Sequence, residues 1–476
     1  MRRTYLFYDL ETSGLNTAFD QILTFACIRT DDRFGEIEQK SVKVKLRPDI
    51  VPSPGALLVN RIGVDETCEG VCEYEAARQI HEQVNTPGTI SLGYNTLGFD
   101  DEFLRFTFYR NLLDPYSHQY SRGCGRMDIF PMTALYSIFK PELLSWPKNE
   151  DGTPTLRLDQ LSDENNLLHT GGRSHEAMGD VECTLNLAVL LSAEEQVFRY
   201  VASFFDRQAD RVRIEAMEKE FESGGAHYRL GILVSPLMGS ASGYLSQAVC
   251  LGKSRVYANQ NIWLRLDREN LEGFTENVEE SGPLVVRKRY GDVPFILPRL
   301  NRFLYRLPDA GKRLADVNLH LLQKDPGLLE KLAEYHVGFA YPYIPDLDAD
   351  AALYQEGFFT PREKEEILGF HRAGPEDKMA MADKMTSPRL TTIAKRIVAR
   401  NFSAGDIPDS FELEKERGVT RMPYDETVKG FRNDMKRTLT DAAEELEQYK
   451  NTALDEEQST IADRLKKYFE TAMRTK

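Results

Sequence analysis

The chain has no long apolar run. None of its 476 residues lies in an uninterrupted apolar stretch of about 18 residues, the length that a membrane-spanning helix needs. The amino terminus, Met-Arg-Arg-Thr, leads almost at once into a predicted strand, which leaves no room for the apolar core and cleavage site of a signal peptide. These absences predict a globular, cytoplasmic protein with no membrane partner.

Cysteine is also scarce. Six cysteines are scattered along the chain, and only Cys68 and Cys72 are near neighbours in the sequence. No second Cys or His pair follows at a spacing that would complete a zinc site. We expect all six to be reduced thiols.

Positive charge is in deficit. Lysine and arginine number 60 against 75 aspartates and glutamates, a formal net charge of −15. This balance argues at first against a nucleic-acid partner, because phosphate binding normally calls for an excess of cations. It does not exclude one, because a polyanion responds to the local field of a groove.

What the chain does contain is an acidic pair at the end of an apolar segment, in residues 5–14 (YLFYDLETSG). The pattern predicts a buried strand that ends in Asp9 and Glu11, whose side chains point to the same face. Two such carboxylates repel each other, so they belong either in solvent or around a hard cation such as magnesium or manganese. Alone, the pair favours a solvent-exposed strand end.

Two further acidic signals follow downstream. Residues 93–105 (GYNTLGFDDEFLR) predict a turn that leads into a helix, with Asp100 or Asp101 at the helix start, where a capping role is the simpler interpretation. Residues 174–191 predict a second helix, which carries His175 and Asp180 near its first turns. A lone histidine at a helix start is usually structural. Residue patterns alone do not choose between Asp100 and Asp101.

The first 193 residues alternate strands and helices, which predicts an α/β domain with a mixed sheet. We expect a three-strand meander and then a helical stretch with one more strand. After the strand at Tyr5, the predicted strands are 21–30, 41–48 and 89–93, and the predicted helices are 73–84, 101–111, 127–139, 158–165 and 175–191.

The rest of the chain differs in pattern. A charged helical connector (residues 204–225) precedes short apolar runs that predict a small β domain with some helix near residues 317–335. A linker follows at residues 339–351, and helical periodicity continues from residue 357 to the end. We expect domains at residues 1–196, 197–350 and 351–476.

Taken together, the acidic signals match a known pattern. The order and spacing of Asp9, Glu11, Asp100, His175 and Asp180 resemble the histidine-containing branch of the DEDD exonuclease superfamily. Over most of its length the chain also resembles the bacterial exonuclease I family, although the middle third is least similar and the serine of DLETSG departs from the pattern. The segments that carry this resemblance are DLET (9–12), IRTD (28–31), GYN with FDDE (93–102), FYRNLLDPY (108–116), RLDQL (157–161), HEAMGDV (175–181), GFF (357–359) and ARNF (399–402).

This resemblance implies a ribonuclease H-like mixed-sheet exonuclease domain, an SH3-like β domain and an all-α C-terminal domain. It implies two Mg²⁺ ions, replaceable by Mn²⁺, held by Asp9, Glu11, Asp100 and Asp180, with Asp9 bridging both. His175 would take a proton from the attacking water, a role that suits a group with an ordinary pKa of about 6.5. Asp100 is preferred over Asp101 because the motif's acid directly follows the phenylalanine.

The function implied is a metal-dependent exodeoxyribonuclease that removes 5′-mononucleotides processively from the 3′ end of single-stranded DNA, in DNA repair or recombination. The polarity and the DNA preference come from the resemblance. So does the expected partner, single-stranded-DNA-binding protein, through its acidic C-terminal tail; we expect a monomer. Two alternatives stay open: a 3′-to-5′ exoribonuclease of the ribonuclease T or oligoribonuclease kind, and a non-catalytic single-strand-binding scaffold, whose sign would be a lost metal ligand.

Cations and aromatic rings are the expected grip on a single strand. For Tyr116 and Tyr120, a place in the core is as well supported as contact with a strand. For the basic runs 287–290 and 298–306, a solvated surface is as well supported as a binding groove. Helix 391–402 carries Lys395, Arg396 and Arg400, which are expected to close a groove from the other side. The candidate substrate contacts are Glu11, Arg105, Tyr116, Tyr120, Arg157 and Arg302.

Overall fold

The computed structural model describes residues 3–150, 152–168, 176–269, 271–402, 428–449 and 452–474. His175 and Ser174 therefore lie outside the described residues. The chain forms two compact units. The first unit comprises Met1–Arg126, Thr170–Glu182 and Tyr343–Lys476, and the second comprises Met127–His169 and Cys183–Pro342. This division differs from the expected three domains, because the C-terminal helices group with the N-terminal sheet.

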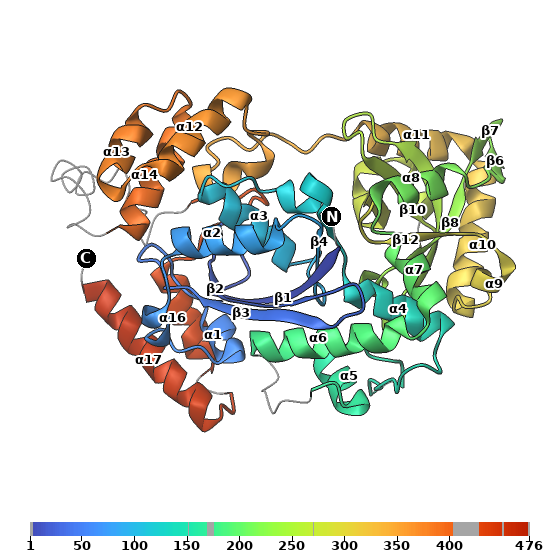
Figure 1. Cartoon of the computed structure of the whole chain (residues 1–476). Helices are drawn as coiled ribbons and strands as arrows, with labels where there is room; N and C mark the ends of the chain where they lie inside the picture. Colours follow the sequence, from blue (N-terminus) through green and yellow to red (C-terminus); the bar gives the residue numbers. More distant parts are fainter. Residues whose placement is uncertain are drawn as a thin grey trace. The chain divides into compact units, whose positions relative to one another are not determined.

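A five-stranded sheet forms the centre of the first unit, in the order β3-β2-β1-β4-β5 (Figure 1). β1 pairs antiparallel with β2 and parallel with β4, so the predicted mixed sheet with its N-terminal meander is confirmed. Its strands are β1 (Thr4–Thr12), β2 (Ile22–Thr30), β3 (Glu36–Lys43), β4 (Thr89–Leu92) and β5 (Gly125–Arg126).

The prediction for the third strand was misplaced. Residues 41–48 were expected, but β3 spans Glu36–Lys43. Val42 and Val44 are buried, as the alternation indicated; Val44 lies beyond the end of β3, where its amide donates to the carbonyl of Leu23 in β2 at 2.8 Å and the residue forms an isolated bridge with Val71. The first half of β3 is an exposed and mostly polar edge, which carries no apolar alternation for a sequence pattern to detect.

Helices cover this sheet and extend the unit. The cluster that joins sheet and helices contains Leu6 and Phe25 from the strands and Ile80, Phe103 and Phe108 from α2 and α3, all nearly inaccessible to solvent. The predicted all-α character of the C-terminal region is confirmed in the described residues. The helices of the first unit are α1 (Pro54–Asn60), α2 (Glu73–Val84), α3 (Asp100–Arg110), α12 (Pro361–Arg372), α13 (Pro375–Asp383), α14 (Pro388–Asn401), α16 (Leu439–Gln448) and α17 (Glu456–Arg474), with short 3-10 turns at Glu66–Glu69, Ser117–Gln119, Ser121–Gly123 and Ala349–Tyr354.

Apolar packing explains why the chain's two ends share a unit. Leu57 and Leu58 of α1 share a buried cluster with Leu446 of α16 and with Leu465 and Phe469 of α17. Figure 1 shows these three helices beside one another. Burying each such side chain stabilises the fold by roughly 1.5–3 kcal/mol. The last two helices are thus part of the core of the first unit, a role that no local pattern indicated.

Buried ion pairs reinforce the same junction. Asp49 lies 3.1 Å from Arg400, and Arg400 lies 2.6 Å from Asp350. Arg396 pairs with Asp348 at 2.6 Å. Arg396 and Arg400 are thereby committed to internal contacts, so the expectation that they line a groove is wrong. Three cations on one helix predict a binding face, but acidic partners elsewhere in the chain pair with Arg396 and Arg400 instead.

The second unit contains a five-stranded sheet of antiparallel pairs, in the order β11-β10-β9-β8-β12, as expected for a small β domain. The predicted helix near residues 317–335 is two helices, α10 (Asp309–Lys324) and α11 (Pro326–Gly338), because Asp325 caps a new helix that starts at Pro326. The other elements are α4 (Ile129–Phe139), α5 (Leu158–Asn165), α7 (Glu195–Ala202), α8 (Arg207–Glu215), β6 (Phe221–Ser223), β7 (Ala226–Tyr228), β8 (Leu230–Val234), β9 (Leu245–Lys253), β10 (Gln260–Arg265), β11 (Val285–Arg289), β12 (Phe295–Pro298) and α9 (Asn301–Leu304). One helix, α6 (Ala177–Ser192), has residues in both units.

Membrane-spanning character and cysteine state can both be read from the described part of the chain. No helix there has both the length and the apolar character that crossing a membrane requires. All six cysteines are free thiols, as expected.

A substitution at Glu73 tests how much the buried ion pairs contribute to the stability of the fold. Its carboxylate lies between Arg47 (2.7 Å) and Arg110 (2.8 Å). Burial opposes its ionisation, but Arg110 and Arg47 outweigh burial and lower the pKa of Glu73 to about 2. Because Glu73→Gln leaves two buried cations less compensated, we expect it to lower the free energy of unfolding at pH 7 by about 3–5 kcal/mol.

The pH dependence has a definite sign. A carboxylate with a lowered pKa contributes its full stability above the ordinary value of 4.5 and loses it as the pH falls toward 2. The stability difference between wild type and Glu73→Gln should therefore be constant above about pH 5.5 and shrink below it. Chemical denaturation from pH 7 to pH 4 measures this, with exposed Glu82→Gln on the same helix as control. A difference that grows in acid would contradict the prediction.

Candidate active site

Strand β1 carries the first two acidic side chains. Along it, the buried Tyr8 and Leu10 alternate with the half-buried Asp9 and Glu11, so both carboxylates point to one face of the sheet, as predicted. The antiparallel pairing with β2 continues through Glu11, and the register shifts immediately after it. The strand thus holds both carboxylates in regular backbone and turns away directly after them.

The turn after β1 is held by short-range hydrogen bonds. The Ser13 hydroxyl donates to Asp20 at 3.1 Å and accepts from the backbone amide of Gln21 at 2.9 Å. A Cβ at Gly14 would lie 2.3 Å from the Asp20 carboxylate, so a larger residue there would displace the group that Ser13 holds. The serine that departs from the family pattern therefore has a structural role in fixing the strand end.

Asp100 reaches the same place through the parallel strand β4. Phe7 of β1 pairs with Leu92, the last residue of β4, and the chain then turns into α3, whose first residue is Asp100. A Cβ at Gly93 would meet the carbonyl oxygen of Tyr8 at 2.4 Å, so glycine is needed for this close approach. The strand, turn and helix together place Asp100, which is 5% exposed, near Asp9.

Asp101 has a different role. Its carboxylate lies 2.8 Å from His118 Nε2 and 2.9 Å from Arg105, and it accepts a further hydrogen bond from Arg126. Burial opposes its ionisation, but Arg126 and Arg105 outweigh burial and lower the pKa of Asp101 well below its ordinary value. The N-cap residue of α3 is Phe99, and both aspartates lie in the first turn of the helix, as expected, where the helix dipole favours a carboxylate. For Asp101, the ion pairs with Arg105 and Arg126 are the dominant contacts.

The four predicted metal ligands are coupled electrostatically. Burial is the largest cause that raises the pKa of Asp9 well above its ordinary value, followed by the charges of Asp100, Glu11 and Asp180. Burial, Asp180 and Asp100 likewise raise the pKa of Glu11 to about 9. Asp180 lies in the first turn of α6. Strand β1 and helices α3 and α6 thus place four acids, from three distant parts of the sequence, near enough to oppose one another's ionisation.

The chemistry of this donor set fits a hard divalent cation. Carboxylate oxygens are the ligands that magnesium, manganese and calcium prefer, and a cation would relieve the repulsion that raises the pKa values of Asp9 and Glu11. Among the described residues, no three His, Cys, Asp or Glu side chains already converge as a finished metal site. His175, the fifth predicted member, lies outside the described residues.

Two predicted substrate contacts line a small cavity that the sequence did not reveal as a unit. Tyr116 and Tyr120 border a cavity of about 160 Å³ in the first unit, together with Phe358 and Phe359. The rings of Tyr116 and Phe358 lie 5.4 Å apart, nearly perpendicular, and Phe358 is 76% exposed. Phe358 and Phe359 belong to the GFF segment (357–359), which carries the family resemblance but is not among the predicted substrate contacts.

The predicted cations lie in varied surroundings. Arg105 is buried against Asp101 and donates to the Tyr354 hydroxyl at 3.1 Å, which is a structural arrangement. Arg157 is largely exposed and pairs with Asp159, and the Arg302 guanidinium lies 4.7 Å from the Phe303 ring; both belong to the second unit. In the basic run 287–290, Lys288 is buried against Asp210. Direct contact of Arg105, Arg157 and Arg302 with a substrate stays a prediction.

Comparison with known proteins agrees with this geometry. Residues 6–188 match a family described as Exonuclease. An exodeoxyribonuclease I from Buchnera aphidicola subsp. Baizongia pistaciae is 35% identical over 392 residues, 78% of each protein. The crystal structure of Escherichia coli exonuclease I with a dA16 oligonucleotide superimposes with a TM-score of 0.82 at 25% identity, covering 99% of this chain and 100% of that one. A structure described as SSB/exonuclease I with an inhibitor gives a TM-score of 0.79 at the same identity and coverage.

The neighbouring aspartates of α3 offer a matched pair of variants. Asp101→Asn removes the carboxylate that compensates Arg105 and Arg126, so it should lower the free energy of unfolding by about 3–5 kcal/mol. Asp100→Asn removes a charge that neighbouring acids oppose, so the melting temperature without metal should stay the same or rise. Thermal melts in chelator compare the two, and equal destabilisation would contradict the distinction.

Proposed function

This chain belongs to the exodeoxyribonuclease I family, and we propose that it removes nucleotides from the 3′ end of single-stranded DNA at the cluster of Asp9, Glu11, Asp100 and Asp180. The chain is an exonuclease, as the sequence predicts. The observation that carries the assignment of the site is the coupling of four acids on β1, α3 and α6. A scaffold that had lost its chemistry would not need to hold four mutually repelling carboxylates together.

Exonucleases of this family depend on divalent metal ions. We assign Asp9, Glu11, Asp100 and Asp180 as the ligands of two Mg²⁺ ions, which Mn²⁺ can replace. Such a pair of ions supplies an activated water and stabilises the charge on the leaving oxygen of a phosphodiester. The raised pKa values of Asp9 and Glu11 support this assignment, because a ligand set that is costly to ionise alone is suited to a bound cation.

The protein's own residues have two roles: they position the acidic side chains, and one of them takes a proton from the attacking water. β1 and α3 fix Asp9, Glu11 and Asp100 on elements of regular structure, which limits their freedom before substrate arrives. The salt bridges of Asp101 hold the first turn of α3 in place. We assign His175 as the general base, five residues before Asp180 in the sequence, because a neutral imidazole can accept the proton of the attacking water near pH 7.

The aromatic cavity is our proposed grip on the strand. Bases stack on exposed rings regardless of their identity, which suits an enzyme that digests any sequence. Tyr116, Tyr120 and Phe358 supply such rings within one unit. The oligonucleotide bound to the Escherichia coli relative supports single-stranded DNA as the substrate.

We also assign a protein partner and an oligomeric state. One related structure combines exonuclease I with single-stranded-DNA-binding protein. That structure supports the same kind of partner for this chain. We further propose that the contact is made through the partner's acidic C-terminal tail, and that this chain acts as a monomer that digests processively.

The experiment for the activity is a time-resolved digestion. A single strand of about 30 nucleotides, longer than the site of one single-strand-binding fold, is labelled at its 5′ end and incubated with Mg²⁺ or with chelator. Stepwise shortening from the 3′ end, only with metal, supports the proposal. Matched RNA and duplex DNA should resist. Digestion of RNA instead of DNA would support the proposed active site but contradict single-stranded DNA as the substrate.

Asp180→Ala should separate cleavage from binding. Loss of a metal ligand removes several kcal/mol of charge stabilisation, so the cleavage rate should fall by roughly 10³-fold or more. Binding of single-stranded DNA in Ca²⁺ should change little, because the stacking and phosphate contacts remain. Filter binding and single-turnover digestion measure the two. Binding that falls as far as cleavage would count against a catalytic role.

Tyr116→Ala tests the proposed grip. Loss of one base stack costs about 1–3 kcal/mol, which predicts a KM for single-stranded DNA that is roughly 5-fold to 150-fold higher with nearly unchanged kcat. Tyr116→Phe keeps the ring and should restore KM. Phe358→Ala should resemble Tyr116→Ala. Wild-type KM in both alanine variants would exclude the cavity as a substrate contact.

A further inference from the structure

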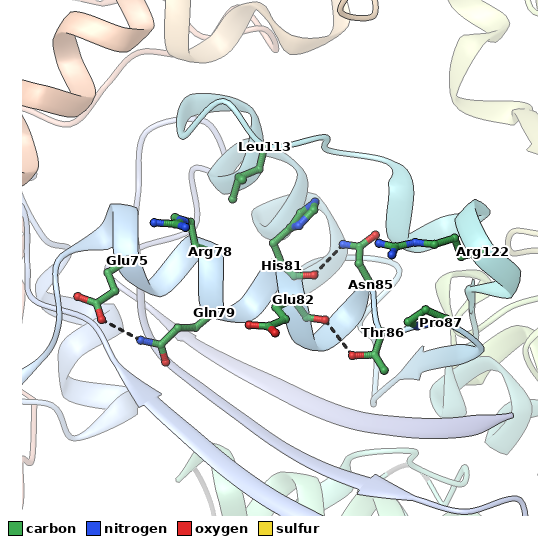
Figure 2. A pocket seen from close by; sticks show the side chains of 10 residues that line it. All are labelled: Glu75, Arg78, Gln79, His81, Glu82, Asn85, Thr86, Pro87, Leu113 and Arg122. Atoms are coloured by element: carbon green, nitrogen blue, oxygen red, sulfur yellow. Dashed lines mark hydrogen bonds between the residues drawn. The ribbon is translucent and has the colours of Figure 1, made fainter. Parts of the chain in front are cut away.

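The first unit also contains a second, polar cavity, with a volume of about 650 Å³. It lies on the outer face of α2 and the turn that follows, and Leu113 and Arg122 complete it (Figure 2). Its volume is in the range of small-molecule sites, about 300–1,000 Å³. Nothing in the proposed reaction uses it.

The strand register separates this cavity from the acidic cluster. Asn85, Thr86 and Pro87 line the cavity and directly precede β4, whose first residue, Thr89, pairs with Thr4 at the start of β1. Asp9 lies five residues further along β1, which is roughly 16 Å of extended strand. The cavity is therefore at the opposite end of the sheet from the carboxylates.

Three polar groups at the cavity lack partners among the described residues. The guanidinium groups of Arg78 and Arg122 make no hydrogen bond or ion pair with any residue that the structure describes, although Arg78 lies 5.7 Å from the Tyr74 ring. Asn85 is only 4% exposed, and its Oδ1 accepts no hydrogen bond, while its Nδ2 donates to the His81 carbonyl at 2.8 Å. An unsatisfied buried amide oxygen is costly, and a ligand with an N–H or O–H donor would satisfy it.

The backbone holds one of these cations in place. Arg122 has φ of 49° and ψ of 37°, a left-handed conformation that is unfavourable for a residue with a side chain. Its carbonyl accepts a hydrogen bond from the amide of Gly88 at 3.1 Å. Figure 2 shows Arg78 and Arg122 on opposite sides of His81 and Asn85. The two cations thus flank the groups in the middle of the cavity.

The charges of the lining favour a ligand with mixed chemistry. Glu75 and Glu82 offset the two arginines, and Glu75 already accepts a hydrogen bond from Gln79 at 3.3 Å. His81 adds no charge near neutral pH, because burial lowers its pKa to about 4. A simple anion would be attracted by the arginines and repelled by the glutamates. A ligand that combines an anionic group with hydrogen-bond donors would bind favourably to both kinds of side chain.

We propose that this cavity binds a nucleoside 5′-monophosphate, with its phosphate on Arg78 or Arg122 and its amine or hydroxyl donors on Asn85 Oδ1 and Glu82. The phosphate matches the unpaired guanidinium groups, and the donors match the unsatisfied amide oxygen and the carboxylate. A 5′-mononucleotide is also the product of the proposed exonuclease, so the cavity would sense product at a distance from the reaction. That regulatory part rests on the proposed function, whereas the binding itself does not.

The test is calorimetric titration of the full chain with dAMP and with dCMP. The titration contains a chelator, because the acidic cluster repels phosphate when no metal is bound there. Saturable binding is expected, and Arg78→Gln with Arg122→Gln should weaken it at least about tenfold, as loss of charge-assisted hydrogen bonds implies. Arg33→Gln, which changes an exposed arginine outside the cavity, is the matched control and should bind as wild type does.

Two control ligands test whether the cavity needs both the phosphate and the nucleoside. Inorganic phosphate and deoxyadenosine should each bind far more weakly than dAMP, since each offers half of the required chemistry. No binding in chelator, or binding that the double variant leaves unchanged, would overturn the site. Inorganic phosphate binding as tightly as dAMP would overturn the nucleotide assignment. All variants should cut single-stranded DNA at the wild-type rate when no nucleotide is added. If the wild-type protein binds dAMP but does not cut DNA, that result refutes the proposed function and leaves the binding site intact.

Discussion

Repulsion among four carboxylates is the constraint on which the rest of the first unit depends. Asp9, Glu11, Asp100 and Asp180 are held near one another although each raises the free energy of ionising its neighbours. The fold must supply that free energy elsewhere. It does so with a strand buried between two neighbours, a helix pinned by the salt bridges of Asp101, and a core that the last two helices of the chain complete.

Two adjacent aspartates show how burial alone does not assign a role. Asp100 and Asp101 are both buried, yet one faces other acids and the other faces two arginines and a histidine. The same physical principle, the charge of the surroundings, makes Asp100 a candidate ligand and Asp101 a structural anchor. The contrast also applies to Arg400, which was expected at a surface and is committed to buried acids.

Local periodicity predicted most of the first unit from the sequence. The apolar run that begins β1 and the helix-forming alanines and glutamates of α2 are strong local signals, and both elements were predicted closely. The start of β3 was missed because an exposed edge strand has no apolar face. The docking of α16 and α17 on α1 was missed because it depends on contacts between residues some 400 positions apart, such as Leu58 and Leu465.

The cluster of four acids was expected because their spacing follows a family pattern, whereas the aromatic cavity was only partly predicted. Tyr116 and Tyr120 were identified as candidates, but their cavity depends on Phe358, more than 200 residues away in the chain. No local rule joins such residues. The unpaired groups around Asn85 likewise carry no sequence signal, because a helix face with mixed charges is typical of any solvated surface.

The measurement that tests the central claim most directly is anomalous scattering from crystals of the protein soaked in Mn²⁺. The account predicts manganese peaks bounded by the carboxylates of Asp9, Glu11, Asp100 and Asp180, with Asp101 still paired to Arg105 and Arg126. Manganese found elsewhere, or no peak at this cluster at concentrations that support cleavage, would contradict the account.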